Sequence, residues 1–330
     1  MHDARAVTFR GAGGPEVLEI SALSVRDPGP NEVLVEVAAA GLNRADLLQR
    51  RGVYPAPTGW PAKVLGLEYA GTVLKAGELA RGIRPGDRVM GIVGGGAMST
   101  HLVVHAREVI PIPEKLSFTE AAAIPEVFLT AFDALFVQGN LHSFETVLLH
   151  AVGSGVGTAA VQLCRAAGCR TIGTSRSKDK LERALELGLS EAVLVNEHFS
   201  HEVLDRTNDR GVELILDTVG GAYLTENLRS LATQGRIVVV GLLGGADAKV
   251  PLGMLLSKRA TLIGTLLRSR LLEEKATLAQ RFIREALPLF SDGRLRPVVD
   301  EVLPMERIAD AHRLLESNAT FGKVVLTWGA

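Results

Sequence analysis

The sequence predicts an α/β protein of two domains, one rich in short strands and one built on a doubly wound parallel sheet. Its length supports this, because 330 residues suffice for two domains and 47% of them are hydrophobic, enough for a packed core. The 35 glycines and the low aromatic content of 5% fit many tight turns between strands and helices. The third observation is a change of pattern near Ser117, where short strands give way to alternating strands and helices.

The first part of the chain, residues 1–116, reads as short strands separated by turns. Strands are expected at 4–10, 32–41, 66–77 and 86–93. One short helix is expected at 43–50. This pattern predicts a partly open barrel.

The second part begins with the sequence SFTE at 117–120, which is a capping box for an alanine-rich helix. Pro125 interrupts that helix, and a second helix is expected at 126–136. Apolar strands separated by helical segments are then expected at 146–150, 170–174, 191–195, 212–217, 236–240 and 260–264. Six such strands predict a parallel sheet covered by helices on both faces.

The last part of the chain contains a charged amphipathic helix at 271–290, a helix at 305–317 and a strand at 322–328. This segment is too short to fold alone, and we expect it to return to the first domain. The parallel-sheet domain would then be an insert in the other domain.

Charge and cysteine content exclude several functions. The formal charge of −1 gives no field that would attract nucleic acid or an anionic membrane, and no segment reads as a signal peptide or membrane span. The two cysteines, Cys164 and Cys169, cannot make a disulfide framework or a four-thiolate zinc site. A reducing, cytoplasmic setting is the simplest expectation.

A glycine-rich turn follows the first strand of the predicted parallel sheet. The sequence AVGSGVG at 151–157 joins that strand to a helix, where glycines allow a pyrophosphate to approach the backbone and the helix N-terminus favours its charge. A purely structural strand–helix turn is the alternative. Its place after the first of six alternating strands favours a dinucleotide site.

The end of the second strand of that sheet bears on the choice of cofactor. NAD sites usually place an acidic residue there for the ribose hydroxyls, but this chain has TSRSKDK at 174–180. Hydroxyls and cations, among them Ser175, Arg176 and Lys180, suit a 2′-phosphate. The sequence therefore favours NADPH over NADH, with a solvated basic helix start as the alternative.

Several segments together resemble one family. They are found, in this order, at 42–50, 65–68, 121–132, 154–163, 266–270 and 322–326. The chain resembles the medium-chain dehydrogenase/reductase superfamily, in its zinc-free quinone oxidoreductase (zeta-crystallin-like) branch, nearest the tumour-suppressor-inducible quinone oxidoreductase group. The resemblance implies a homodimer formed through Rossmann domains. It also implies a GroES-like catalytic domain at 1–122, a Rossmann NADP(H)-binding domain at 123–265 and a return to the catalytic domain at 266–330.

The resemblance also bears on metal. Zinc members of the superfamily carry a cysteine where this chain has the segment 41–46, and Gly-His-Glu where it has Gly66-Leu67-Glu68. Without a thiolate or imidazole, a catalytic zinc site is not expected. His101 and His105 stand in a strand-like segment and read as structural. Reduction of a quinone or an activated alkene needs no metal, since the hydride acceptor already stabilises the anion that forms.

Residue roles follow from the resemblance. Asn43 and Tyr54 are expected near the nicotinamide, in the space a zinc would occupy, with Tyr54 as hydrogen-bond donor to the developing oxyanion. A tyrosine packed on Pro55 and Pro57 is the alternative. The residues expected to bind cofactor are Asn43, Thr130, Ser154, Gly155, Val156, Gly157, Ser175, Arg176, Lys180, Gly241, Leu242, Leu266, Leu267 and Lys323.

Three of these expectations have competing interpretations. Thr130 also continues an amphipathic helix, and Lys323 at the start of a strand could simply be solvated. Many relatives place a tyrosine after the third strand of the Rossmann sheet, but this chain has Val-Asn-Glu-His at 195–198. Glu197 would disfavour a 2′-phosphate if it pointed inward.

The predicted function is zinc-independent reduction of a quinone by NADPH. An NADPH-dependent enoyl or enone reductase is the nearest alternative, because the same apparatus delivers hydride to a polarised C=C bond. A third possibility is an NADPH-binding protein with little catalysis. Near-neutral charge argues against nucleic acid as its partner.

Overall fold

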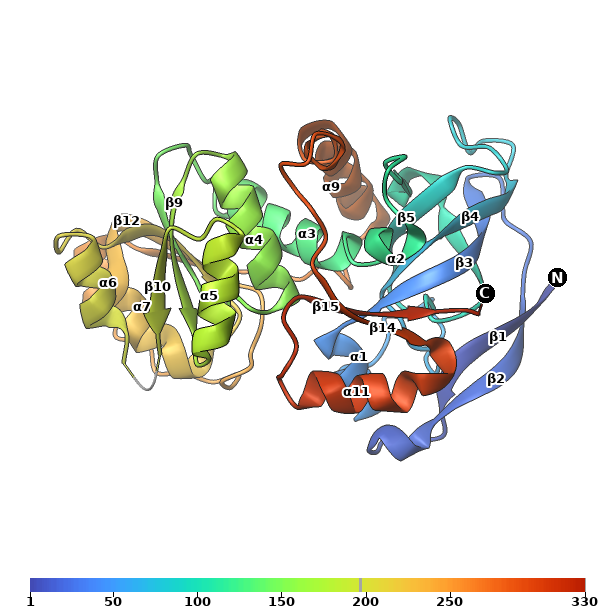
Figure 1. Cartoon of the computed structure of the whole chain (residues 1–330), viewed down its shortest axis with the longest axis horizontal. Helices are drawn as coiled ribbons and strands as arrows, with labels where there is room; N and C mark the ends of the chain where they lie inside the picture. The colour runs from blue at the N-terminus through green and yellow to red at the C-terminus, as the bar shows by residue number, and fades with distance from the viewer. Residues whose placement is uncertain (196–197, 330) are drawn as a thin grey trace. The chain divides into compact units, whose positions relative to one another are not determined.

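The computed structural model describes residues 1–195 and 198–329 and has the mixed α/β fold that the sequence predicts (Figure 1). It divides into two compact units, the first formed by Met1–Leu129 with Leu267–Ala330 and the second by Thr130–Leu266. The expectation that concerns Glu197 lies outside the described residues.

The first unit is built on a β-sheet of seven strands in the order β14-β15-β3-β4-β5-β7 with β6 paired to β3. The strands are β3 (Glu32–Leu42), β4 (Glu68–Ala76), β5 (Arg88–Ile92), β6 (His101–His105), β7 (Ile110–Pro111), β14 (Val299–Pro304) and β15 (Lys323–Thr327). A separate antiparallel pair comprises β1 (His2–Phe9) and β2 (Leu18–Val25). His101 and His105 thus stand on a strand, as expected.

The first unit also contains eight complete helical segments in the described ranges. They are η1 (Pro15–Val17), α1 (Arg44–Arg50), η2 (Ala106–Glu108), α2 (Phe118–Ala121), α9 (Leu272–Glu285), α10 (Pro288–Ser291), η5 (Met305–Arg307) and α11 (Ile308–Glu316). The capping box of α2 is confirmed, because the Ser117 hydroxyl accepts from the Glu120 N–H at 3.2 Å and the Ser117 N–H donates to the Glu120 carboxylate at 2.8 Å.

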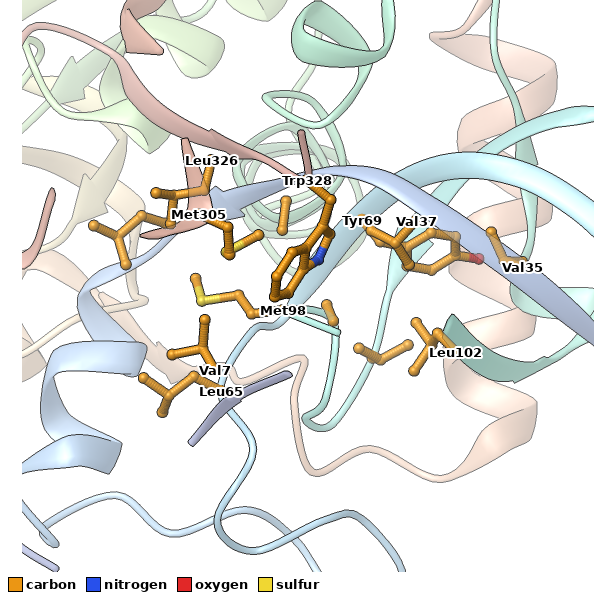
Figure 2. Close-up of a cluster of buried hydrophobic side chains, with 14 of the residues drawn as sticks. Val7, Val35, Val37, Leu65, Tyr69, Met98, Leu102, Met305, Leu326 and Trp328 are labelled. Carbon is orange, nitrogen blue, oxygen red and sulfur yellow. The ribbon is translucent and has the colours of Figure 1, made fainter. Parts of the chain in front are cut away.

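The core of the first unit joins its N-terminal and C-terminal segments (Figure 2). Val35 and Val37 of β3 pack in one buried cluster with Leu326 of β15 and with Met305 and Trp328. Each of these side chains is at most 8% exposed. Burial of aliphatic and aromatic surface on this scale is the main stabilising term of such a unit, so the last segment completes the core of the first.

The second unit contains a sheet of six parallel strands in the order β10-β9-β8-β11-β12-β13. The strands are β8 (Thr146–Leu149), β9 (Arg170–Ser175), β10 (Glu191–Leu194), β11 (Val212–Asp217), β12 (Leu231–Val239) and β13 (Thr261–Gly264). The order reverses between β8 and β11, and ligands of such sheets bind at the carboxyl ends of the strands at this switch point.

Helices cover this sheet on both faces, with α4 and α5 on one side and α6 and α7 on the other (Figure 1). Their bounds are α4 (Gly155–Ala166), α5 (Lys178–Glu186), α6 (Ser200–Arg206), η4 (Gly221–Tyr223), α7 (Leu224–Ser230) and α8 (Leu252–Lys258). The predicted doubly wound sheet is confirmed.

Two predicted helices differ from the structure. The helix expected at 126–136 is α3 (Pro125–Phe132), which continues as a π-helical segment, η3 (Asp133–Gln138). The helix expected at 271–290 is divided: α9 ends at Glu285 and α10 begins at Pro288. Proline has no backbone N–H, so it cannot continue the hydrogen-bond ladder of α9 and stands at a helix start instead. Throughout the described ranges, every helix is too short or too polar to cross a membrane.

Candidate active site

A buried ion pair lies where three strands of the first unit meet. Strand β3 pairs with β4 on one side and with β15 on the other, which brings Glu68 and Lys323 to either side of its last residues. The Lys323 ammonium donates to the Glu68 carboxylate at 2.6 Å, the Leu42 carbonyl at 2.7 Å and the Asn43 side-chain oxygen at 2.7 Å. Lys323 is 3% exposed and Glu68 is fully buried, so Lys323 is not a solvated strand-start lysine.

Asn43 links the two charges. Its side-chain Nδ2 donates to Glu68 Oε1 at 2.8 Å and to the Gly41 carbonyl at 3.3 Å, while its Oδ1 accepts from Lys323. Both amide hydrogens therefore already have protein acceptors. This geometry makes Asn43 a residue that positions Glu68 and Lys323, and a donor bond from Asn43 to substrate would have to displace one of these contacts.

A second buried carboxyl, Asp46 of α1, anchors the same region. It accepts from the Asn43 N–H at 2.8 Å and from the Gly66 N–H at 3.0 Å. Burial raises the pKa of Asp46 to about 6, against the opposing effect of these two N–H donors.

Arg268 holds the loop that carries Tyr54. Its guanidinium donates to the Gly94 carbonyl at 2.8 Å, to the Tyr54 carbonyl at 3.1 Å and to the side-chain oxygen of Gln49, and it lies 5.0 Å from the centre of the Tyr54 ring. Arg268 is not among the site residues that the sequence predicts. Its signal was present, since it belongs to the segment 266–270 that carries the family resemblance.

The hydroxyl of Tyr54 remains available. The side chain is partly buried, and no hydrogen bond engages the hydroxyl within residues 1–195 and 198–329. Burial raises the pKa of Tyr54 above its ordinary value, so the phenol keeps its proton at neutral pH. The expected role of Tyr54 as a hydrogen-bond donor is compatible with this geometry.

Glu126 is a site residue that sequence reasoning missed. It stands in the first turn of α3, and its backbone N–H donates to Glu68 Oε2 at 2.8 Å. Burial, reinforced by the neighbouring Glu68, raises the pKa of Glu126 to about 8. A glutamate after a proline at a helix start reads as an ordinary first-turn acid, so nothing local in the sequence reveals this environment.

The residues in the space expected for zinc do not fit a metal. Both oxygens of Glu68 are engaged, Oε1 by Asn43 and Lys323 and Oε2 by the Glu126 N–H. The residue before it, Leu67, offers no ligand atom. Among the residues that the structure describes, no three His, Cys, Asp or Glu side chains are arranged to hold a metal ion.

The glycine turn of the second unit suits a pyrophosphate. A Cβ on Gly157 would lie 2.4 Å from the Ala151 carbonyl oxygen, so only glycine lets α4 pack this closely on the end of β8. The Ser154 hydroxyl caps the helix by accepting from the Gly157 N–H at 3.0 Å. In the described part of the chain, the N–H groups of Gly155 and Val156 have no acceptor. Free N–H groups at the start of a helix are typical phosphate donors.

Lys180 lies across this turn. A Cβ on Gly153 would be 2.6 Å from Lys180 Cδ, so the lysine stem packs on the glycine backbone. Ser175, at the end of β9, accepts from the Ser177 N–H at 3.1 Å, and the next residue, Arg176, is exposed. The structure thus brings Lys180 and the glycine turn together at the carboxyl edge of the sheet.

A tyrosine lies at this edge of the sheet, although none follows the third strand in the sequence. Tyr223 of η4, which follows β11, packs edge-on against His150 with ring centres 4.9 Å apart. Burial raises the pKa of Tyr223, and the nearby Arg176 opposes that shift. The sequence signal was weak because Tyr223 stands far from the third strand in the chain.

A buried hydrogen-bond network holds His150, the histidine that packs against Tyr223. Asn227 donates to Asp217 at 2.9 Å, so its side-chain oxygen accepts from His150 Nε2 at 2.7 Å. His150 Nδ1 then accepts from the Thr174 hydroxyl at 2.8 Å. Burial lowers the pKa of His150, which stays neutral and ties the ends of β8, β9 and β11 together.

The other predicted cofactor residues are more dispersed. Thr130 is partly buried on α3, and a Cβ on Gly241 would lie 2.9 Å from the Thr218 carbonyl. Leu242 and Leu266 are exposed. Leu267 is buried in the first unit, so its side chain is a packing residue and only its backbone is left for a cofactor contact.

Comparison with known proteins agrees with this architecture. The alcohol dehydrogenase GroES-like domain family matches residues 29–114, and the zinc-binding dehydrogenase family matches residues 155–285. Quinone oxidoreductase-like protein 2 of Bos taurus is 33% identical over 312 residues, which cover 94% of this chain and 89% of that protein.

Two solved structures share the whole fold. The crystal structure of Escherichia coli quinone oxidoreductase complexed with NADPH has a TM-score of 0.88 at 31% identity and covers 98% of this chain and 99% of that one. The crystal structure of an NAD-dependent alcohol dehydrogenase has a TM-score of 0.87 at 34% identity and covers 98% of this chain and all of that one.

The fold and these similarities define an oxidoreductase of the medium-chain dehydrogenase/reductase class. The chain belongs to the quinone oxidoreductase branch of that superfamily.

Proposed function

We propose that this protein reduces quinones with NADPH and without zinc. The observation that carries the proposal is the closed Asn43–Glu68–Lys323 cluster, in which side chains that could otherwise face a metal satisfy one another. A cluster closed in this way offers no ligand set for a Lewis-acidic metal, which suits an electron-poor acceptor better than an alcohol.

The second unit supports binding of the cofactor. The free N–H groups of Gly155 and Val156 would receive the pyrophosphate, with Lys180 across the turn. Bound NADPH would supply the hydride. The two solved structures above are named for different cofactors, so the preference for NADPH rests on Ser175, Arg176 and Lys180 and on the lack of an acid at the end of β9.

Tyr54 is the donor that we assign to the substrate. Its neutral hydroxyl has no partner in the described ranges, and Arg268 lies over the ring and donates to the Tyr54 carbonyl. A hydrogen bond to the substrate oxygen strengthens as negative charge develops there, so it stabilises the transition state more than the ground state.

We also propose that two copies associate through the second unit, in a cytoplasmic setting. Strand β13 ends the six-stranded sheet, and Leu262 on it is 43% exposed. Leu252 and Leu256 of α8 are 63% and 76% exposed. An open strand edge beside exposed leucines fits a self-association surface. Both cysteines are free and buried, as a reducing compartment allows.

A turnover assay tests the proposal. Purified enzyme is treated with a chelator and offered NADPH or NADH with a panel of quinones, enones and alcohols. We expect quinone reduction with NADPH that survives chelation and no oxidation of alcohols. Turnover of enones alone would move the assignment to alkene reduction, and activity that is lost to chelator and restored by zinc would contradict the proposal.

A further inference from the structure

We propose that Glu126 is the acid that protonates the reduced substrate, an inference that rests on the proposed quinone reduction. Hydride transfer to a quinone leaves an oxyanion, which needs one proton to become the hydroquinone. In this step the O–H bond of the Glu126 carboxylic acid breaks and a new O–H bond forms on the substrate. The resulting carboxylate is reprotonated from water before the next turnover.

Glu126 differs from the other charged groups of the cluster in its hydrogen bonds. Glu68 accepts from three donors, Asp46 accepts from two backbone N–H groups, and Lys323 donates to three oxygens. The carboxyl of Glu126 has no hydrogen-bond partner in residues 1–195 and 198–329, and its side chain is partly exposed. It is therefore the carboxyl of this cluster that is free to give its proton to a ligand.

Four charged groups from other segments act on Glu126. Glu68 of β4 and Asp46 of α1 disfavour ionisation of Glu126, whereas Lys323 of β15 and Arg268, which precedes α9, favour it. Burial is the largest effect and outweighs the two cations. The result is a carboxyl that is protonated at neutral pH.

Glu126 and Tyr54 differ in what they can donate. Both lie in the first unit, and the charge of Glu126 is among the causes that raise the pKa of Tyr54. With a pKa of about 8, Glu126 can release its proton near neutral pH, where general acids work best. The pKa of Tyr54 is raised further above neutrality, so Tyr54 orients the oxygen through a hydrogen bond and keeps its proton.

The test compares the wild type with Glu126→Gln. The backbone N–H that Glu126 donates to Glu68 persists in this variant, so the cluster stays intact. Glu114→Gln, a change at an exposed glutamate of the same unit, is the matched control. We expect Glu126→Gln to lower kcat roughly a hundredfold or more, in the range that general acids contribute. The fall of wild-type kcat as pH rises through about 8 should disappear.

Two measurements are independent of activity. The infrared band of a protonated carboxyl should be present in the wild type at pH 7, vanish as pH rises through about 8, and be absent from Glu126→Gln. Because the folded state keeps a proton that the unfolded state releases, wild-type stability should fall between about pH 4.5 and 8. The stability of Glu126→Gln should fall less than that of the wild type over the same pH range.

The outcomes separate the two proposals. Wild-type kcat and an unchanged pH profile in Glu126→Gln would overturn the acid role while quinone reduction stands. A wild-type enzyme that binds NADPH and reduces no quinone would overturn the proposed function and, with it, this step. If Glu126→Gln misfolds, Glu126→Asp is the second variant, because it keeps a carboxyl and should retain the loss of kcat as pH rises. A Glu126→Asp enzyme whose kcat does not fall with rising pH would also overturn the acid role.

Discussion

The charged cluster of the first unit and the glycine turn of the second differ in whether their polar groups have hydrogen-bond partners within the protein. In the first unit, Asn43, Glu68 and Lys323 satisfy one another and leave no open coordination position. In the second unit, Gly155 and Val156 present backbone N–H groups that have no acceptor among the described residues. The first region is therefore complete without a ligand, whereas the second calls for an anion.

This difference means that substitutions in the two regions should have different consequences. Changes in the closed cluster should affect folding stability first, because they leave a buried charge without its partner. Changes in the open turn should affect cofactor affinity first, because the N–H groups of Gly155 and Val156 have no acceptor among the described residues and are left for a ligand.

The largest effect should come from Lys323→Met, which removes the cation from the cluster. Glu68 would remain buried with fewer donors, and we expect the free energy of unfolding to drop by about 3–5 kcal/mol. Chemical denaturation measures it, with Lys115→Met, at an exposed lysine, as the control. A double variant with Glu68→Gln should lose less than the sum of the single changes, and full additivity would refute the pairing.

Next in size is Tyr54→Phe, which removes only the hydroxyl. We expect turnover to fall ten- to a thousandfold, about 1.4–4 kcal/mol of transition-state stabilisation, while NADPH affinity holds. Single-turnover rates with NADPH already bound measure this. Near-normal rates for Tyr54→Phe, together with damage from Tyr54→Ala, would show that the ring packs and the hydroxyl takes no part.

A third change, Gly157→Ala, tests the open turn. The new methyl would meet the Ala151 carbonyl and force α4 away from β8, at a cost of about 1–3 kcal/mol. We expect dissociation constants for NADPH and NADH to rise together by about tenfold or more. The matched control is Gly253→Ala in α8, where a methyl meets no atom within 4 Å, and an equal loss there would argue against the turn.

The smallest effect should come from Lys180→Ala. Without the cation, NADPH should bind about tenfold more weakly, or 1.4 kcal/mol, while NADH affinity stays nearly unchanged. Titration calorimetry with both cofactors measures the difference, and Lys249→Ala, at an exposed lysine of the same unit, is the control. A loss common to both cofactors would mean that Lys180 acts through the glycine turn on which its stem packs.

Sequence patterns were sufficient for features whose parts are close together in the chain. The six strands of the parallel sheet, the capping box at Ser117 and the turn at 151–157 each depend on a few consecutive residues. Local geometry decides them, because a glycine that must approach a carbonyl or a serine that caps a helix acts within one turn. The family resemblance added Asn43, Tyr54 and Lys323 as candidates before any contact was visible.

Tertiary structure alone decided what those candidates touch. Lys323 contacts Asn43 from a strand 280 residues further along the chain and pairs with Glu68 as well. Charged groups from four other segments act on Glu126. Periodicity and propensity describe neighbours along the chain and carry no information on such distant pairings. The sequence by itself determined the fold class and the glycine turn, while the folded chain decided which charges are paired and which carboxyl keeps its proton. The physical reason is that burial and electrostatic pairing depend on what surrounds a group in space.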